Sequence, residues 1–327
     1  MTQPLIEAVD ISKSFPVRPR AFARPLQLNA VNGVSLRLRE GETLGLAGES
    51  GSGKSTLGKV LLGLLQPDDG EVVYRGTPLH HLSGKDLLGF RKEVQMIFQD
   101  PYSSLNPRMR VGDAIAEPLL IHGLAEPSSR KDLVRQLLVK VGLSDDHYHR
   151  YPHEFSGGQR QRIGIARALA VSPRLLIADE PVSALDLSIQ AQIINLLQDL
   201  KKHYELSLII IAHDLSVLRH MCDRIAVMYL GRIVEVGRTD ALFGGFLHPY
   251  TEALLAAIPG AGKIVPQAPP PLKGDMPNPI APPPGCPFHT RCPYSRPEIC
   301  AAGMPVLEEK EPGHCAACHF SSDLFRK

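Results

Sequence analysis

Hydrophobic residues along the chain form two kinds of pattern that predict its secondary structure. Short apolar runs suited to buried strands occur at residues 43–47, 94–98, 175–178 and 208–212. Apolar residues at helical spacing occur at residues 57–64, 111–120, 129–141 and 188–202. Strands that alternate with helices favour an α/β fold built around a mostly parallel sheet.

Residues with period-two alternation predict further strands near both ends of this region. The segments 5–11 and 31–38 alternate in this way, and a loop bearing Pro and Arg residues is predicted between them at 16–25. The runs 225–228 and 233–236 resemble the two arms of a hairpin. These segments predict antiparallel pairs beside the parallel sheet.

A proline-rich stretch divides the chain. Residues 259–285 contain Pro269-Pro270-Pro271 and Pro282-Pro283-Pro284, a composition typical of a semi-rigid linker. We therefore expect a large domain over residues 1–258 and a small module over 286–327. The helical pattern from about 100 to 165 indicates a helical insertion within the large domain.

The clearest chemical signal is Gly48-Glu49-Ser50-Gly51-Ser52-Gly53-Lys54-Ser55, a full match to the phosphate-loop pattern G-x-x-x-x-G-K-[ST]. It stands between a predicted strand and a predicted helix, an order that lets backbone N–H groups and a helix N-terminus surround a phosphate chain. Lys54 would reach the β- and γ-phosphates, and the hydroxyl of Ser55 would help to hold Mg²⁺. The loop predicts binding of a nucleoside triphosphate.

A pair of acidic residues supplies the second half of this chemistry. Asp179-Glu180 ends the apolar run at 175–178. A phosphate loop requires a carboxylate near the metal and a group that activates the attacking water. Asp179 is predicted to lie near Mg²⁺, and Glu180 is predicted to act as the general base.

Composition narrows the class of protein. Hydrophobic residues make up 43% of the chain and charged residues 21%, which is normal for a globular protein. The net charge of +2 and the lack of a long Lys or Arg run give no reason to expect a nucleic-acid partner. No apolar run is long enough for a membrane span, and residues 1–5 lack the features of a secretory signal, so we expect a cytoplasmic protein with reduced cysteines.

A second glycine motif, Ser156-Gly157-Gly158-Gln159, opens a predicted helix and would form another anion site. With this motif the chain resembles the ATP-binding cassette (ABC) ATPases over about residues 5–255. The resemblance implies a RecA-like core with an antiparallel β subdomain and a helical subdomain. It also implies that the signature of one subunit closes on the nucleotide of another, so that dimerisation is expected.

The resemblance also implies roles for individual residues. The residues implied to bind ATP and Mg²⁺ are Phe15, Gly48, Ser50, Gly51, Gly53, Lys54, Ser55, Thr56, Gln99 and Asp179, with Ser55, Gln99 and Asp179 near the metal. The residues implied to act in catalysis are Glu180, His213 and Lys54. The residues implied to meet the nucleotide of the partner subunit are Ser156, Gly157, Gly158, Gln159 and Asp186.

A narrower resemblance comes from the stretch 99–108, from His248-Pro249-Tyr250-Thr251 and from the Cys-bearing tail. The chain looks like the F-type ATPase subunit of bacterial dipeptide and oligopeptide importers. This implies a peripheral position on the cytoplasmic face of the membrane, two permease subunits, a sister ATPase and an extracytoplasmic binding protein. Nickel importers share the architecture. Rival interpretations are a nucleic-acid-processing ABC ATPase, which would need long inserts or basic arms, and a non-hydrolysing regulatory subunit, against which Glu180 and His213 argue.

The tail concentrates cysteines at positions 286, 292, 300 and 318, with Cys315 as a spare. Four thiolates could hold zinc or a [4Fe–4S] cluster, but the spacing matches neither paired zinc ligands nor ferredoxin motifs. Members of the importer family with this spacing are associated with a [4Fe–4S] site. The three alternatives are a [4Fe–4S] cluster on Cys286, Cys292, Cys300 and Cys318, zinc on the same residues, and thiols without a metal.

Overall fold

The computed structural model describes residues 3–18, 25–100, 102, 104–183, 185–258, 272 and 274–325. The chain divides into two compact units. The first unit comprises Met1–Leu38, Thr43–Pro78 and Ala212–Lys327, and the second comprises Arg39–Glu42 and Leu79–Ile211. The first half of the predicted linker at 259–285, residues 259–271 and 273, falls outside the described residues.

The first unit contains an antiparallel sheet in the strand order β2-β1-β4-β5. Its strands are β1 (Ile6–Val17), β2 (Leu26–Leu38), β4 (Asp69–Tyr74) and β5 (Thr77–Pro78). This sheet confirms the predicted antiparallel β subdomain. Both strands are longer than the hydrophobic pattern predicts: β1 continues past residue 11 to Val17, and β2 begins at Leu26 before residue 31. β4 pairs with β1 only as far as Ser12, whereas β2 pairs with β1 on through Pro16. At Pro16, β1 therefore has a described strand partner on one side, a position at which proline is tolerated.

A second set of strands in the first unit follows the order β11-β12-β10-β9-β3. Its strands are β3 (Thr43–Ala47), β9 (Arg224–Tyr229), β10 (Arg232–Arg238), β11 (Glu308–Glu311) and β12 (His314–Ala316). β3 runs parallel to β9, and β9 and β10 form the predicted hairpin. Every residue of β3 is buried, as is typical of a strand covered on both faces of a sheet.

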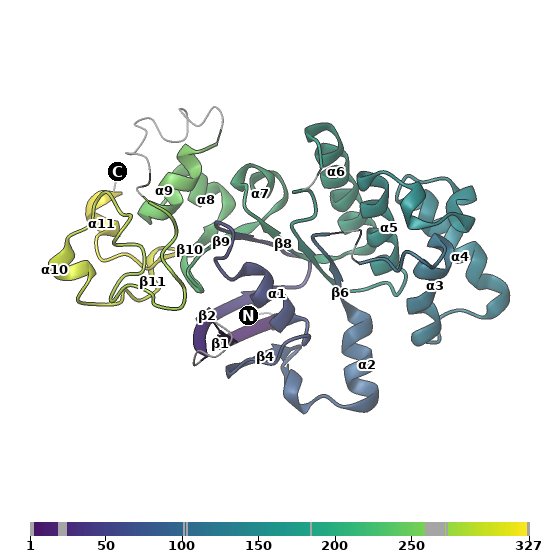
Figure 1. Cartoon of the computed structure of the whole chain (residues 1–327), viewed down its shortest axis with the longest axis horizontal. Helices are drawn as coiled ribbons and strands as arrows, with labels where there is room; N and C mark the ends of the chain where they lie inside the picture. Colours follow the sequence, from purple (N-terminus) through teal and green to yellow (C-terminus); the bar gives the residue numbers. More distant parts are fainter. Residues whose placement is uncertain are drawn as a thin grey trace. The chain divides into compact units, whose positions relative to one another are not determined.

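The C-terminal segment takes part in this sheet. β12 pairs antiparallel with β10 through Glu235 opposite Ala316 and Val236 opposite Cys315. Figure 1 shows these C-terminal elements, in yellow, beside β10. Through β11 and β12, the C-terminal segment therefore shares a sheet with the phosphate-loop strand β3.

The helices of the first unit are α1 (Lys54–Leu61), α7 (Leu215–Met221), α8 (Thr239–Gly244), α9 (Pro249–Ala256), α10 (Pro297–Cys300) and α11 (Ser321–Leu324). α1 begins inside the phosphate loop and ends close to where its apolar spacing predicts. The buried side chains Leu57, Val60 and Leu61 form its core-facing stripe.

The second unit contains parallel strands in the order β8-β7-β6. These strands are β6 (Val94–Ile97), β7 (Leu175–Asp179) and β8 (Ser207–Ala212). The helices are α2 (Gly84–Glu93), α3 (Val111–Ile121), α4 (Pro127–Lys140), α5 (Gly157–Leu169) and α6 (Leu187–Tyr204). α3, α4 and the start of α5 occupy the range in which the sequence predicts a helical insertion.

Candidate functional site

The phosphate loop requires glycine at two positions because backbone crowds them. Gly48 has φ of +144°, and a Cβ atom there would lie 2.2 Å from the carbonyl oxygen of Met228. Gly53 has φ of +103°, and a Cβ atom would lie 2.0 Å from the carbonyl oxygen of Ala30. No side chain fits at either position without moving backbone, so the loop keeps the open cradle that a phosphate chain needs.

Lys54 places its ammonium inside this cradle. The side chain is buried, and its Nζ donates to the carbonyl oxygens of Gly48 at 2.7 Å and Glu49 at 2.8 Å. Ser55 and Thr56 follow in the first turn of α1, where both are half-buried. The structure thus brings together the loop glycines, one buried positive charge and the N-terminus of a helix, which are the elements of an anion site.

The second unit brings together Gln99 and Glu180. The Nε2 of Gln99 donates to the Oε2 of Glu180 at 2.7 Å. Asp179, directly before it, is the buried last residue of β7. Glu180 has a left-handed backbone with φ of 44°, an uncommon conformation for a residue other than glycine that is concentrated at functional sites. Its N–H donates to the carbonyl oxygen of Ile211 at 2.9 Å, which helps to fix this turn.

The Ser156-Gly157-Gly158-Gln159 motif caps α5. The Oγ of Ser156 accepts from the N–H of Gln159, and the Oε1 of Gln159 accepts from the N–H of Ser156 at 3.0 Å. This reciprocal pair is a capping box, which fixes the first turn of the helix. Gly158 lies against Ile189 of α6, and a Cβ atom there would come within 2.5 Å of the Ile189 side chain. Gly157 lies on the exposed side of the same turn.

The remaining predicted residues lie at the ends or edges of elements. Asp186 caps α6 by accepting from the N–H of Ile189 at 3.0 Å, and hydrogen bonds from Ser188 and Ile189 lower its pKa. His213 is exposed directly after β8, and the neighbouring Asp214 caps α7. Phe15 is half-buried in β1 of the first unit.

The four tail cysteines line one small cavity in the first unit. Cys286, Cys292, Cys300 and Cys318 share its wall with residues that include His248 and Phe288. Burial raises the pKa of the Cys286 thiol to about 11 and that of the Cys292 thiol to about 12. Within the described part of the chain, however, no group of three or more His, Cys, Asp or Glu side chains is arranged to hold a metal ion. The convergence of the four thiols agrees with the sequence pattern, whereas preformed metal coordination does not appear among these residues.

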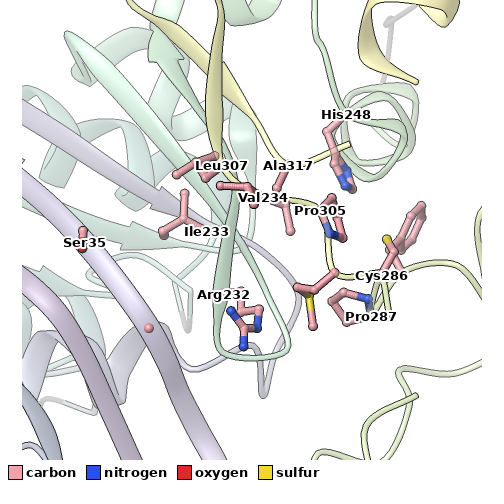
Figure 2. Close-up of a pocket in the computed structure, with 14 residues that line it drawn as sticks. Ser35, Arg232, Ile233, Val234, His248, Cys286, Pro287, Pro305, Leu307 and Ala317 are labelled. Carbon is pink, nitrogen blue, oxygen red and sulfur yellow. The ribbon is translucent and has the colours of Figure 1, made fainter. Parts of the chain in front are cut away.

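A second cavity adjoins the thiols. Figure 2 shows this pocket, of about 330 Å³, between the β10 residues Arg232, Ile233 and Val234 and the C-terminal residues Pro305 and Leu307. Cys286 belongs to the walls of both cavities. Burial lowers the pKa of nearby His248 to about 3, so its ring is neutral and its Nδ1 accepts from the N–H of Tyr250.

Two residues to which the sequence analysis assigns no role in nucleotide binding lie at the phosphate loop. The guanidinium of Arg291, in the tail, forms an ion pair with the carboxylate of Glu49 at 2.7 Å. The hydroxyl of Tyr250 accepts from the backbone N–H of Glu49 at 2.8 Å. Both partners lie more than 200 residues further along the chain. Local sequence contains no signal for such contacts.

The fold and the phosphate loop define the class of an ABC ATPase, and comparison with known proteins gives the family. The protein-family model described as "ABC transporter" matches residues 31–183, and the family model described as "Oligopeptide/dipeptide transporter, C-terminal region" matches residues 234–300. The second match covers most of β10, all of α8 and α9, and the first part of the cysteine-bearing tail. Among the described residues, no helix combines the length and the apolar character that a membrane span requires.

Relatives match over nearly the whole chain. A putative oligopeptide transport ATP-binding protein of Bacillus subtilis is 50% identical, covering 97% of this chain and 95% of the relative. The oligopeptide transport ATP-binding protein OppF of Salmonella typhimurium is 49% identical over 93% of this chain and 92% of the relative. The dimeric ADP- and phosphate-bound ATP-binding cassette MJ0796 matches with a TM-score of 0.64 and 27% identity, covering 72% of this chain and 98% of that structure. The chain belongs to the family of ABC transporter ATP-binding proteins that carry the oligopeptide/dipeptide transporter C-terminal region.

Proposed function

We propose that this chain is the ATP-hydrolysing subunit that powers the import of dipeptides or oligopeptides through a membrane ABC transporter. The observation that carries this proposal is identity of 45–50% to oligopeptide and dipeptide transport ATP-binding proteins over most of the chain. The match includes the C-terminal region at 234–300 as well as the cassette. A nucleic-acid-processing ABC ATPase would share the cassette and lack that region.

The site residues divide the work of hydrolysis. Lys54 and the loop N–H groups bind the phosphates, while Ser55, Gln99 and Asp179 hold Mg²⁺. Glu180 accepts the proton of the attacking water, and the hydrogen bond from Gln99 orients its carboxylate. Phe15 stacks on adenine, and His213 contacts the γ-phosphate. These assignments follow from motif position together with the Gln99 to Glu180 contact.

Dimerisation completes the site in this proposal. The helix N-terminus behind Ser156-Gly157-Gly158 supports an anion contact, because its N–H groups and dipole favour negative charge. The partner is a sister ATPase, and its bound nucleotide meets five residues of this chain: Ser156, Gly157, Gly158, Gln159 and Asp186. Two permease subunits and an extracytoplasmic binding protein complete the transporter, and the chain lies at the cytoplasmic face of the membrane.

Transport assays on the assembled complex test the substrate class. The chain is co-expressed with its membrane partners, reconstituted in vesicles, and ATP hydrolysis is measured with dipeptides, longer peptides or Ni²⁺ together with the cognate binding protein. The proposal predicts that peptides stimulate hydrolysis and accumulate in the vesicles. Stimulation by Ni²⁺ without any response to peptides would favour the nickel-importer alternative and refute the peptide proposal.

We further propose that the thiol pocket receives a [4Fe–4S] cluster. Its support is the donor set: four thiols line one cavity, and thiolate sulfur is the ligand such clusters use. Visible absorption with iron, sulfide and zinc analysis of anaerobically purified protein tests this. A colourless sample with zinc, or with neither metal, would refute the cluster.

A further inference from the structure

We infer that Arg291 in the C-terminal tail is a positioning residue for the phosphate loop and neutralises the negative charge of Glu49 beside the bound triphosphate. The inference deepens the proposed function and rests on it. It assigns the tail a direct part in nucleotide affinity. Arg291 touches the loop, so it acts on nucleotide through Glu49.

Glu49 is the second residue of the phosphate loop and is held at three points. Its carboxylate accepts two hydrogen bonds from the Arg291 guanidinium, at 2.7 Å and 3.1 Å. Its N–H donates to the Tyr250 hydroxyl at 2.8 Å. Its carbonyl oxygen accepts from the Nζ of Lys54 at 2.8 Å. One loop residue thus links the tail, α9 and the phosphate-binding lysine.

The guanidinium is placed rigidly. The Arg291 side chain is 7% exposed, and Tyr229 lies against it with the guanidinium 6.0 Å from the ring centroid. Tyr229, Tyr250 and Phe288 pack edge-on or tilted at centroid distances of 4.7–5.4 Å. A planar, two-pronged ion pair on an aromatic base loses little conformational freedom on forming. The contact therefore fixes the carboxylate of Glu49 in one orientation.

Charge explains why this contact matters for nucleotide. A triphosphate brings several negative charges into a loop that already contains the carboxylate of Glu49. Without Arg291, that carboxylate would repel the phosphates across a partly buried site, where screening is weak. Hydrogen bonds from Arg291 also keep the Glu49 carboxylate from competing with phosphate oxygens for the Lys54 ammonium. Both effects predict a penalty that grows with the charge of the nucleotide.

The turn that carries Arg291 is itself well fixed. The N–H of Arg291 donates to the carbonyl oxygen of Phe288 at 3.0 Å, and so does the N–H of Cys292. Phe288 is fully buried in the aromatic group. The backbone of residues 288–292 is therefore anchored independently of the ion pair. A substitution of the Arg291 side chain can be expected to leave this backbone in place.

Equilibrium nucleotide binding to the full-length chain tests the inference. Dissociation constants for ATP, ADP and adenosine are measured by isothermal titration for the wild type, Arg291→Gln, Arg291→Lys, Glu49→Gln and the double variant Glu49→Gln/Arg291→Gln. Arg291→Gln should weaken ATP binding about tenfold, equivalent to about 1.4 kcal/mol. It should weaken ADP binding less and leave adenosine unchanged. Arg291→Lys and the double variant should regain most of the affinity, because the first restores the charge and the second removes the repulsion.

Two controls separate this effect from general damage. Arg238 forms a comparable two-pronged pair with Asp240 on an exposed surface, so Arg238→Gln should leave all three dissociation constants unchanged. If Arg291→Gln fails to fold, Glu49→Gln decides, because it removes the repelling charge and should bind ATP at least as tightly as the wild type. Weaker ATP binding by Glu49→Gln would then overturn the inference.

The outcomes also distinguish this inference from the proposed function. Wild-type binding of ATP that Lys54→Ala abolishes supports the function. An unchanged ATP dissociation constant in Arg291→Gln, or an equal loss for ATP and adenosine, would then overturn the role of Arg291 alone. Failure of the wild type to bind ATP would overturn the function and the inference together.

Discussion

Replacing His314 by alanine should destabilise the chain strongly, because it breaks a buried pair that joins the C-terminal strand to the sheet. The Nε2 of His314 lies 2.7 Å from the Oε1 of Glu235, and both side chains are almost fully buried. The same carboxylate oxygen accepts from the N–H of Leu247 at 2.8 Å. The Glu235 carboxylate would keep that one hydrogen bond and lose its other described partner.

The size of the effect follows from burial. Removing one partner of a buried hydrogen bond costs about 1–3 kcal/mol, and more where the remaining group is charged, since it leaves a polar group without compensation in the interior. The His314 ring also lies against Gly237, where a Cβ atom would come within 2.7 Å of it, so the truncation leaves a cavity. The remaining bond from Leu247 lowers the loss, and we expect a decrease in the free energy of unfolding of about 3 kcal/mol.

Urea denaturation of the full-length chain, followed by circular dichroism, measures this. Glu235→Gln/His314→Ala should recover part of the loss, because a neutral glutamine amide can still accept from the N–H of Leu247 and costs less to bury than a carboxylate. Glu308→Gln, which breaks the exposed pair with Lys310 on β11, should change stability by less than about 1 kcal/mol. A His314→Ala variant within 1 kcal/mol of the wild type would refute the claim that β12 is locked into the sheet by this pair.

Three further predictions follow from local geometry. Gly53→Ala should abolish ATP binding in a fluorescent-nucleotide assay, since its Cβ atom would lie 2.0 Å from the carbonyl oxygen of Ala30. The control Gly244→Ala, whose Cβ atom would meet nothing within 4 Å, should bind ATP normally. ATP binding by Gly53→Ala would contradict the role given to the loop glycines. Ser156→Ala should cost about 1 kcal/mol in urea denaturation by removing the capping box of α5, and an unchanged midpoint would argue against it. Hydrogen bonds from Lys13 and Ser14 lower the pKa of Asp68 to about 2 from 3.8, so the stability it contributes is present above pH 4 and is lost as pH falls toward 2. Because Asp68 is partly exposed, Asp68→Asn should remove only about 1 kcal/mol at pH 7 and flatten this acid dependence; an unaltered pH profile would refute the assignment.

The sequence predicts the cassette elements well because their signals are local. The run 43–47 coincides with β3, and glycine spacing marks the phosphate loop because only glycine fits where Gly48 and Gly53 meet backbone. The convergence of four cysteines on one cavity also agrees with their clustering in the tail. Motifs built from residues that are close together along the chain can be recognised from the sequence alone.

The C-terminal contribution is harder to predict because its signals are not local. β11 has the sequence Glu-Glu-Lys-Glu, and as an edge strand it needs no apolar pattern. α2 was not predicted because its buried residue is Phe90 alone, which gives no helical stripe. The pairs Arg291 with Glu49 and His314 with Glu235 join residues 242 and 79 positions apart. Such contacts depend on the tertiary fold, and a single sequence does not reveal them.

Coupled ATP hydrolysis and peptide uptake by the assembled transporter, with Glu180→Gln beside the wild type, test the central claim most directly. Glu180→Gln keeps the shape of the side chain and removes the general base. ATP binding should therefore stay within about twofold, while hydrolysis and uptake fall by more than about 100-fold. Hydrolysis and peptide uptake at wild-type rates in Glu180→Gln would contradict the account.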